Sequence, residues 1–358
     1  MYEYTHGGNA AFEPGGAGLL DLSANINPLG FPQEAAQAVI DSLADCASYP
    51  DAHCRALRQR LGEYEGVPPE WIFCGAGASD ILFRLPRCVG AKKAWTLSPT
   101  FSDYERSVRS FGARMACYQL TEKEGFLVSS DALRHLAQVK PDLVFLCNPN
   151  NPTGLLTDRA FMEKLVTLCQ ELGAIVVVDE CFLDFVLEAQ RYSMLALTAE
   201  YENLVVLKAF TKTFAMPGLR LGYAVTRNQR IMDGLAWHGP DWAVSVPTQA
   251  AGLAVLPNAD AYLKRTVRFV ATQRERLSAE MRAMGYCIFN SAANYLFFQT
   301  PSEFDLLAAL NQKGIRIRPC ANYRGLSRDC YRVAVSTVES NGIFLAAMRE
   351  VTPWHVRS

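Results

Sequence analysis

The stretch Thr211-Lys212-Thr213-Phe214-Ala215-Met216-Pro217-Gly218-Leu219-Arg220-Leu221-Gly222-Tyr223 carries the strongest indication of the fold. A lysine that bonds covalently to a cofactor needs a fixed place in a rigid turn, with other groups nearby to hold that cofactor. The guanidinium of Arg220 suits a phosphate. Upstream stand Asn148-Pro149-Asn150-Asn151-Pro152-Thr153-Gly154 and Val178-Asp179-Glu180. A lysine near an arginine means little alone, but these elements in this order predict a cofactor site.

Length and composition favour a cytoplasmic protein with two domains. The 358 residues suit one large and one small domain, and 50% of them are hydrophobic. With 35 basic and 36 acidic residues, nothing indicates a nucleic-acid partner. We find no signal peptide and no apolar run long enough for a membrane helix. The 11 cysteines show no metal spacing, so we interpret them as small core residues in a reducing cytosol and expect no metal. A reactive Cys181 is the alternative, although adjacent carboxylates raise the pKa of a thiol.

Apolar patterning predicts three parts: an N-terminal arm over 1–30 that joins the small domain, a large α/β domain over 31–240 and a small α+β domain over 241–358. We expect helices near 33–46, 53–65, 158–172 and 247–284. Two-sided apolar runs are typical of parallel strands buried on both faces. The predicted strands are 71–74, 94–97, 143–147, 174–178 and 204–207 in the large domain, and 295–299, 315–318 and 331–335 in the small one.

Together these motifs resemble the pyridoxal-phosphate enzymes of the aspartate aminotransferase fold, the class I/II aminotransferase family. The resemblance implies fold type I, with a mainly parallel sheet in the large domain, and pyridoxal 5′-phosphate as cofactor. Lys212 is then the catalytic residue, which bonds to the cofactor and later shuttles a proton. Asp179 pairs with the pyridinium nitrogen, and Asn151 bonds the ring 3′-oxygen. The alternatives are a helix N-cap for Asp179 and an Asx turn for Asn151.

A second motif predicts the rest of a phosphate cradle. Gly75-Ala76-Gly77-Ala78-Ser79-Asp80 follows a predicted strand and opens a helix, whose free N–H groups attract anions. Gly77, Ala78 and Ser79, with Thr211 and Arg220, are our cofactor-binding candidates. By resemblance Phe101 stacks on the cofactor ring, unless it is a core aromatic. Tyr49 resembles a tyrosine that reaches the cofactor phosphate of a second subunit, which implies a homodimer with shared sites.

The ends of the chain resemble one branch of this family, the threonine-phosphate decarboxylases. The segments that carry this resemblance are His6–Asn9, Asp21–Gly30, Tyr49–Ala52, Ala209–Lys212, Ile317–Tyr323 and Tyr331–Val335. The histidinol-phosphate aminotransferases share the central motifs, but usually have a tyrosine where this chain has Phe182. The resemblance implies a carboxy-lyase that converts L-threonine O-3-phosphate to (R)-1-amino-2-propanol O-phosphate, for cobalamin biosynthesis.

The substrate anchors implied by the resemblance are arginines and the N-terminal arm. Arg332 resembles the arginine for the substrate carboxylate, and Arg318 another anion-binding arginine; His6 and Asn25 resemble pocket residues. Each arginine has a surface position as its alternative, and so has His6. The anchors matter because they orient the substrate, and the bond held perpendicular to the cofactor ring is the one that breaks. If that bond leads to the carboxylate, the reaction is decarboxylation; if it is the Cα–H bond, the reaction is transamination.

Three positions depart from the expected pattern and leave alternatives open. Ala209 stands in place of a hydroxyl residue that bonds the cofactor phosphate, Ser336 in place of a second arginine, and Ala76 in place of an asparagine. O-phosphoserine is therefore a second candidate substrate. An aminotransferase of the histidinol-phosphate type and a non-catalytic module on the same fold are the competing functions; an intact Lys212 argues against the latter.

Overall fold

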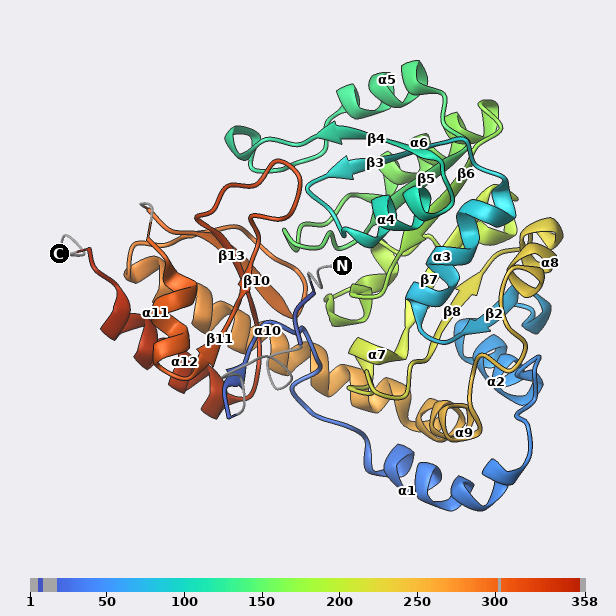
Figure 1. The fold of residues 1–358 in the computed structure, drawn as a ribbon, viewed down its shortest axis with the longest axis horizontal. Helices are drawn as coiled ribbons and strands as arrows, with labels where there is room; N and C mark the ends of the chain where they lie inside the picture. The colour runs from blue at the N-terminus through green and yellow to red at the C-terminus, as the bar shows by residue number, and fades with distance from the viewer. Residues whose placement is uncertain (1–5, 9–17, 302–303, 355–358) are drawn as a thin grey trace.

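A computed structural model describes residues 6–8, 18–301 and 304–354, so Asn9 of the N-terminal motif lies outside the described residues. A seven-stranded sheet forms the larger part of the molecule, with strand order β2-β8-β7-β6-β5-β3-β4 (Figure 1). Its strands are β2 (Ile72–Gly75), β3 (Lys93–Ser98), β4 (Arg114–Gln119), β5 (Leu143–Cys147), β6 (Ile175–Asp179), β7 (Leu204–Ala209) and β8 (Gly222–Val225).

The sheet is parallel from β4 to β7, and β8 is antiparallel to both of its neighbours. The five strands predicted for this part are confirmed to within a residue or two. Two strands were not predicted. Edge strand β4 holds a short apolar stretch, Met115–Tyr118, but its side chains are only half-buried or exposed, and β8 is only four residues long and lies directly after the lysine motif.

Helices cover both faces of this sheet. On one face lie α3 (Ala78–Val89), α4 (Asp103–Ser110) and α8 (Gln229–Trp237); on the other lie α5 (Ser130–Val139) and α6 (Arg159–Glu171). Each face of the sheet packs against its helices in a separate hydrophobic core. Two successive residues of β5 illustrate this: Leu143 packs against the α3, α4 and α8 side and Val144 against the α5 and α6 side, and both are fully buried. Burial on both faces explains the continuous apolar runs of the central strands.

A third packing group lies beside β2 and β8. Here α1 (Gln33–Asp41), α2 (Arg55–Glu65) and α9 (Val246–Val255) meet, and the short helix α7 (Phe210–Thr213) follows directly from β7. The predicted helix over 247–284 is interrupted: α9 ends in a 3₁₀ turn at Leu256–Asn258, and α10 (Ala259–Ala283) follows. Pro257 lies in that turn, where it removes a backbone donor.

The smaller part holds a four-stranded antiparallel sheet, in the order β12-β13-β10-β9. Its strands are β9 (Cys287–Ile288), β10 (Tyr295–Gln299), β12 (Arg318–Pro319) and β13 (Cys330–Ala334); α10, α11 (Leu306–Gln312) and α12 (Val338–Val351) pack against it. The predicted strand 315–318 divides into β11 (Ile315–Arg316) and β12.

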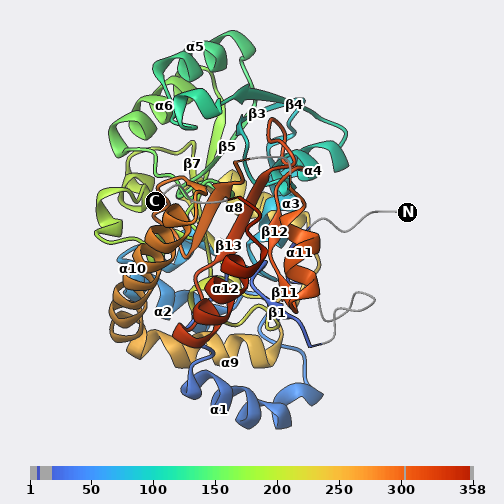
Figure 2. The same cartoon turned by 90° about the vertical axis from the view of Figure 1, so that its left-hand side faces the viewer.

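The N-terminal arm is tied to this smaller part. Strand β1 (Leu20–Asp21) pairs in parallel with β11, and the backbone N–H of Ala334 donates to the carbonyl of Leu22 (2.9 Å). Figure 2 shows β1 beside β11 and β13. Among the described residues, no helix combines the length and apolar content needed to cross a membrane.

Candidate active site

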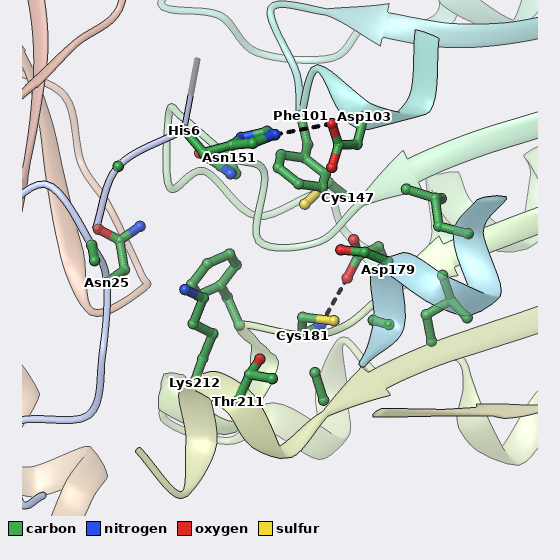
Figure 3. Close-up of a pocket in the computed structure, with 18 of the residues that line it drawn as sticks. His6, Asn25, Phe101, Asp103, Cys147, Asn151, Asp179, Cys181, Thr211 and Lys212 are labelled. Atoms are coloured by element: carbon green, nitrogen blue, oxygen red, sulfur yellow. Dashed lines mark hydrogen bonds and ion pairs between the residues drawn. The ribbon is translucent and has the colours of Figure 1, made fainter. Parts of the chain in front are cut away.

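A cavity of about 330 Å³ lies between the carboxyl ends of the central strands, the N-terminal arm and the smaller sheet. Parallel α/β sheets bind their ligands at this edge. Lys212 extends into the cavity from α7 (Figure 3). Burial, together with the positive charges of Arg332 and Arg220, lowers the pKa of Lys212 to about 8. A lysine of this kind has a larger fraction of neutral, nucleophilic amine near neutral pH than an ordinary lysine, and is mainly neutral above about pH 8.

Asp179 is the last residue of β6 and points into the cavity (Figure 3). Its Oδ2 accepts a hydrogen bond from the hydroxyl of Tyr104 (2.7 Å), and its Oδ1 accepts one from the backbone N–H of Cys181 (3.0 Å). Burial and the Asp179 charge raise the pKa of Tyr104 well above its usual value, so this hydroxyl stays a donor. The carboxylate is thus fixed in place and kept as an acceptor.

The predicted phosphate cradle is present at the start of α3. Gly77 is the N-cap of this helix with φ +85°, and a Cβ there would meet Nη2 of Arg220 at 2.7 Å. A Cβ on Gly222 would meet the backbone N of Ala78 at 2.3 Å. Both glycines are therefore required for the arginine, the turn and β8 to approach so closely. The result places a guanidinium beside helix N–H groups, which is a site for a phosphate.

Asn151 lines the cavity opposite Lys212, and two residues of the smaller part hold its side chain, one on β13 and one in the segment between β12 and β13. Its Oδ1 accepts hydrogen bonds from the Tyr323 hydroxyl (3.3 Å) and from Nη1 of Arg332. Because the oxygen is engaged, the amide nitrogen is the group left to donate toward a ring oxygen in the cavity.

The far wall of the cavity carries two arginines from neighbouring strands. Arg318 on β12 and Arg332 on β13 are register partners, and both are more than nine-tenths buried. Nη2 of Arg332 donates to the carbonyl of Ser23 (2.9 Å). With its amide oxygen turned toward Arg332, Asn25 accepts from Nε and Nη1 at 3.3 Å each. Nη2 of Arg318 donates to Oδ1 of Asn322 (3.1 Å). Neither arginine is a surface residue, which excludes that alternative.

His6 and Phe101 form the rim of the cavity on the α4 side. His6 Nε2 lies 3.0 Å from Oδ1 of Asp103, and the His6 and Phe101 rings are 5.6 Å apart (Figure 3). Phe101 is half-buried and also packs edge-on against Tyr104. Phe101 thus lines the cavity and also packs in the adjoining core, so its position is compatible with a cofactor-stacking residue and with a core aromatic.

Two cofactor candidates, Gly77 and Tyr49, do not line the cavity: Gly77 lies behind the cradle as the N-cap of α3, and Tyr49 lies away from the cavity. The Tyr49 side chain is 78% exposed and stacks on the ring of Trp242, with centroids 4.4 Å apart. The other cofactor candidates Ala78, Ser79 and Thr211 line the cavity.

The positions that depart from the family pattern are also visible. Ala209 lines the cavity without a hydroxyl, and Phe182 lies edge-on to Tyr295. Ser336 lines an adjoining cavity of about 580 Å³ that also reaches Lys212. The backbone N–H of Ala76 donates to Oδ2 of Asp80, which shapes the turn without an asparagine side chain. Burial, and then Asp179, raise the pKa of the Cys181 thiol well above the usual value, which argues against the alternative of a reactive thiol.

Several contacts that hold the cavity residues in place were not predicted from the sequence. Tyr104 supports Asp179, Asp103 holds His6, and Ser23 and Tyr323 hold Arg332 and Asn151. Only Tyr323 and Ser23 stand inside motifs that we had singled out. Tyr104 and Asp103 lie on an ordinary amphipathic helix, where nothing local distinguishes them.

The cavity fits pyridoxal phosphate: a buried lysine with a lowered pKa, a fixed carboxylate at a strand end and a phosphate cradle surround one space. The family model of class I and II aminotransferases matches residues 17–347, and the chain belongs to that family. The cofactor of this protein is therefore pyridoxal 5′-phosphate.

More particular similarities follow. The threonine-phosphate decarboxylase of Salmonella typhimurium is 32% identical, over 98% of this chain and 97% of that protein. An adenosylcobalamin biosynthesis bifunctional protein of Leptospira interrogans is 30% identical over 97% of this chain, which corresponds to 41% of that longer protein. The solved structure of histidinol-phosphate aminotransferase from Clostridium acetobutylicum has a TM-score of 0.87 at 26% identity, covering 93% of this chain and 99% of that one.

Proposed function

We propose that this protein is a pyridoxal-phosphate-dependent carboxy-lyase that decarboxylates L-threonine O-3-phosphate to (R)-1-amino-2-propanol O-phosphate, in cobalamin biosynthesis. The relatives named for threonine-phosphate decarboxylation and adenosylcobalamin biosynthesis support it. The observation that carries it is the pair of buried arginines, Arg318 and Arg332, on one wall of the cavity. Two guanidiniums beyond the cofactor cradle suit a substrate with two anionic groups, a carboxylate and a phosphate.

In this proposal each residue of the site has one task. Arg220 and the N–H groups of Ala78 and Ser79 hold the cofactor phosphate, Asp179 the ring nitrogen, Asn151 the ring oxygen, and Thr211 and Phe101 border the cofactor. Bound pyridoxal phosphate supplies an electron sink for a bond broken at the substrate Cα. Lys212 would hold the cofactor through Nζ, and the same Nζ would supply the proton to the substrate Cα.

The substrate residues decide which bond breaks. Arg332 is rigidly held by Ser23, Asn25 and Asn151, so a carboxylate bound to it has one orientation. We assign the substrate phosphate to Arg318 and His6, which line the same cavity. The carboxylate leaves as carbon dioxide, and the electron pair left at Cα takes up the proton from Lys212.

A second candidate function is transamination of the histidinol-phosphate type. The solved aminotransferase with TM-score 0.87 and the loss of an arginine at Ser336 favour it. It would use the same cofactor residues and a different substrate pose. O-phosphoserine, which gives ethanolamine phosphate, is the second candidate substrate for decarboxylation.

Phosphorus NMR of the cofactor-loaded protein separates these functions. The protein is incubated with O-phosphothreonine and, separately, with O-phosphoserine, without any oxo-acid. Catalytic formation of aminopropanol phosphate or ethanolamine phosphate would establish decarboxylation and name the preferred substrate. No product under these conditions, with turnover of histidinol phosphate once 2-oxoglutarate is added, would assign the protein to the aminotransferases.

The proposal also includes a cytoplasmic homodimer, with the chain divided into an arm over 1–30, a large domain over 31–240 and a small domain over 241–358. All 11 cysteines are free, which is typical of a reducing compartment. Three large hydrophobic side chains within ten residues of the chain are 58–78% exposed: Ile40, Leu43 and Tyr49. Such exposure is typical of interface residues in an isolated protomer.

Mixing two inactive variants tests the shared site. If Tyr49 reaches the cofactor phosphate of the second subunit, a hybrid of Tyr49→Ala and Lys212→Ala subunits has one intact site, and activity returns on mixing. No recovery from well-folded, exchanging subunits would remove Tyr49 from the site.

A further inference from the structure

A second buried lysine, Lys208, lies four residues before Lys212 and does not line the cavity. Its neighbours Leu207 and Ala209 do line it, so Lys208 points to the other face of β7. There Nζ lies 2.9 Å from Oε1 of Glu65 and 3.4 Å from Oδ1 of Asp184. The hydroxyl of Tyr223, the cross-strand partner of Lys208, donates to Glu65. We call these four residues, Glu65, Asp184, Lys208 and Tyr223, the ion cluster.

Lys208 is permanently charged. Burial works to lower its pKa, but Asp184 and Glu65 outweigh this and hold the pKa well above its usual value. The cluster joins α2, β7, β8 and the 3₁₀ turn at Leu183–Phe185. It therefore ties three separate segments of the larger part to the strand that precedes Lys212.

One hydrogen bond connects the ion cluster to the helix of the reactive lysine. Oγ1 of Thr213 donates to Oδ2 of Asp184 (3.0 Å), and Thr213 follows Lys212 directly. The N-terminal arm holds the same two residues by their backbone. The N–H of Asn27 donates to the carbonyl of Lys212 (3.2 Å), and its side-chain amide donates to the carbonyl of Thr213 (2.7 Å). Helix α7 has only four residues, too few to hold its own shape.

Buried ion pairs contribute little net stability compared with apolar residues of similar size, so the placement of this one calls for another explanation. We propose that the ion cluster is a positioning device: through Thr213 it fixes α7, and with it the approach of Lys212 Nζ to the cofactor aldehyde. Thr213 and Asp184 are thus positioning residues. This inference rests on the proposed role of Lys212 and is independent of the substrate.

The matched pair Thr213→Val and Thr213→Ser tests it. Valine keeps the shape and loses the hydroxyl, whereas serine keeps the hydroxyl. Cofactor release is measured without substrate, from the change in visible absorbance in the presence of an aldehyde trap. In Thr213→Val we expect this release to be about fivefold to tenfold faster. We expect kcat to fall by a similar factor with KM nearly unchanged. Thr213→Ser should restore both values.

Thr198→Val is the control, because Thr198 is also fully buried and its hydroxyl also donates to a carbonyl, that of Leu195 (2.7 Å). It should lose stability as Thr213→Val does, without faster cofactor release. Equal release and kcat in Thr213→Val and the unmodified protein would overturn the proposal. So would equal acceleration in Thr198→Val.

Asp184→Asn supplies a second measurement if Thr213→Val fails to fold. The amide oxygen can still accept from Thr213 but no longer balances Lys208, so cofactor release should again be faster. Unchanged release in a folded Asp184→Asn protein would contradict a role for the charges. Loss of the covalent bond to Lys212 is tested separately by Lys212→Ala, so failure of the proposed function and failure of this inference give different results.

Discussion

Lys208 and Lys212 occupy the same strand-to-helix connection, and their surroundings are opposite. Around Lys208 stand Glu65 and Asp184, which keep the pKa above its usual value. Around Lys212, burial and then Arg332 and Arg220 lower the pKa to about 8. Both side chains are buried, so burial does not distinguish them. The signs of the neighbouring charges make one lysine a fixed cation and the other a nucleophile.

Removal of the nucleophile should have the largest effect. Lys212→Ala is expected to reduce turnover by at least ~10⁴-fold, because the covalent bond to the cofactor and the proton donor are lost together. Turnover and borohydride-reducible visible absorbance are the measurements. Lys212→Arg, which keeps the positive charge, should be equally inactive; substantial activity in either variant would refute the assignment.

The free energy of unfolding should depend on Lys208 more than on Lys212, the reverse of the order expected for activity. Lys208→Met leaves Glu65 and Asp184 without a counter-charge and should lower the free energy of unfolding by about 3–5 kcal/mol. Lys212→Met in the cofactor-free protein should be neutral or slightly stabilising, because it removes a cation from between two arginines. Urea denaturation of both cofactor-free variants measures the difference. Equal losses would show that the two surroundings do not differ as described.

The arginines should set the pH at which Lys212 reacts. Its amine is neutral above about pH 8, so the rate of cofactor capture by cofactor-free protein should rise with pH through that value and then level. Arg332→Gln removes a positive charge, raises the pKa of Lys212 and should move the midpoint upward by roughly one pH unit. Capture at pH 8 then slows. Substrate kcat/KM should also fall about 10- to 100-fold.

Arg324→Gln is the matched control for this prediction. Arg324 is half-exposed, pairs with Glu105 (2.8 Å) and does not line the cavity. Its removal should leave the midpoint in place. A shift of equal size in both variants would mean that net charge, and not the local position of Arg332, controls Lys212.

The smallest effect is expected at Ala209, which separates the two lysine environments along the chain. Ala209→Ser restores a hydroxyl on the cavity wall near the phosphate cradle. One added hydrogen bond contributes ~1 kcal/mol, so cofactor release should slow about fivefold. Ala209→Val, of similar size to threonine but without a hydroxyl, is the control and should not slow release.

The sequence alone predicted the residues whose function depends on local context. Lys212, Asp179 and Arg220 stand next to turn residues and strand ends that define their place, and the structure brings their side chains to one cavity. The central strands were predictable for a similar reason: they are buried on both faces, and continuous apolar runs mark them. Strand β4 has only a four-residue apolar stretch with small and polarisable side chains, because it lies at the edge of the sheet and is not buried on both faces.

Contacts between distant segments were not predictable. Tyr104 meets Asp179 across 75 positions, and Arg332 meets Ser23 across 309. Lys208 shows the difficulty most clearly. In the sequence it is one more lysine at the end of a strand, and only the packing of α2 and the turn at Asp184 against β7 surrounds it with carboxylates.

The pairing of β1 with β11 has a consequence for how the chain is made on the ribosome. The seven-stranded sheet needs no residue beyond Val225, so it can assemble while the last third of the protein is still being translated. The arm cannot pair with β11 until Ile315 and Arg316 have emerged, and Ser23 can accept from Arg332 only after that residue has been made. The arginine wall of the cavity is thus the last part of the site to form, after the lysine, the carboxylate and the phosphate cradle are already in place.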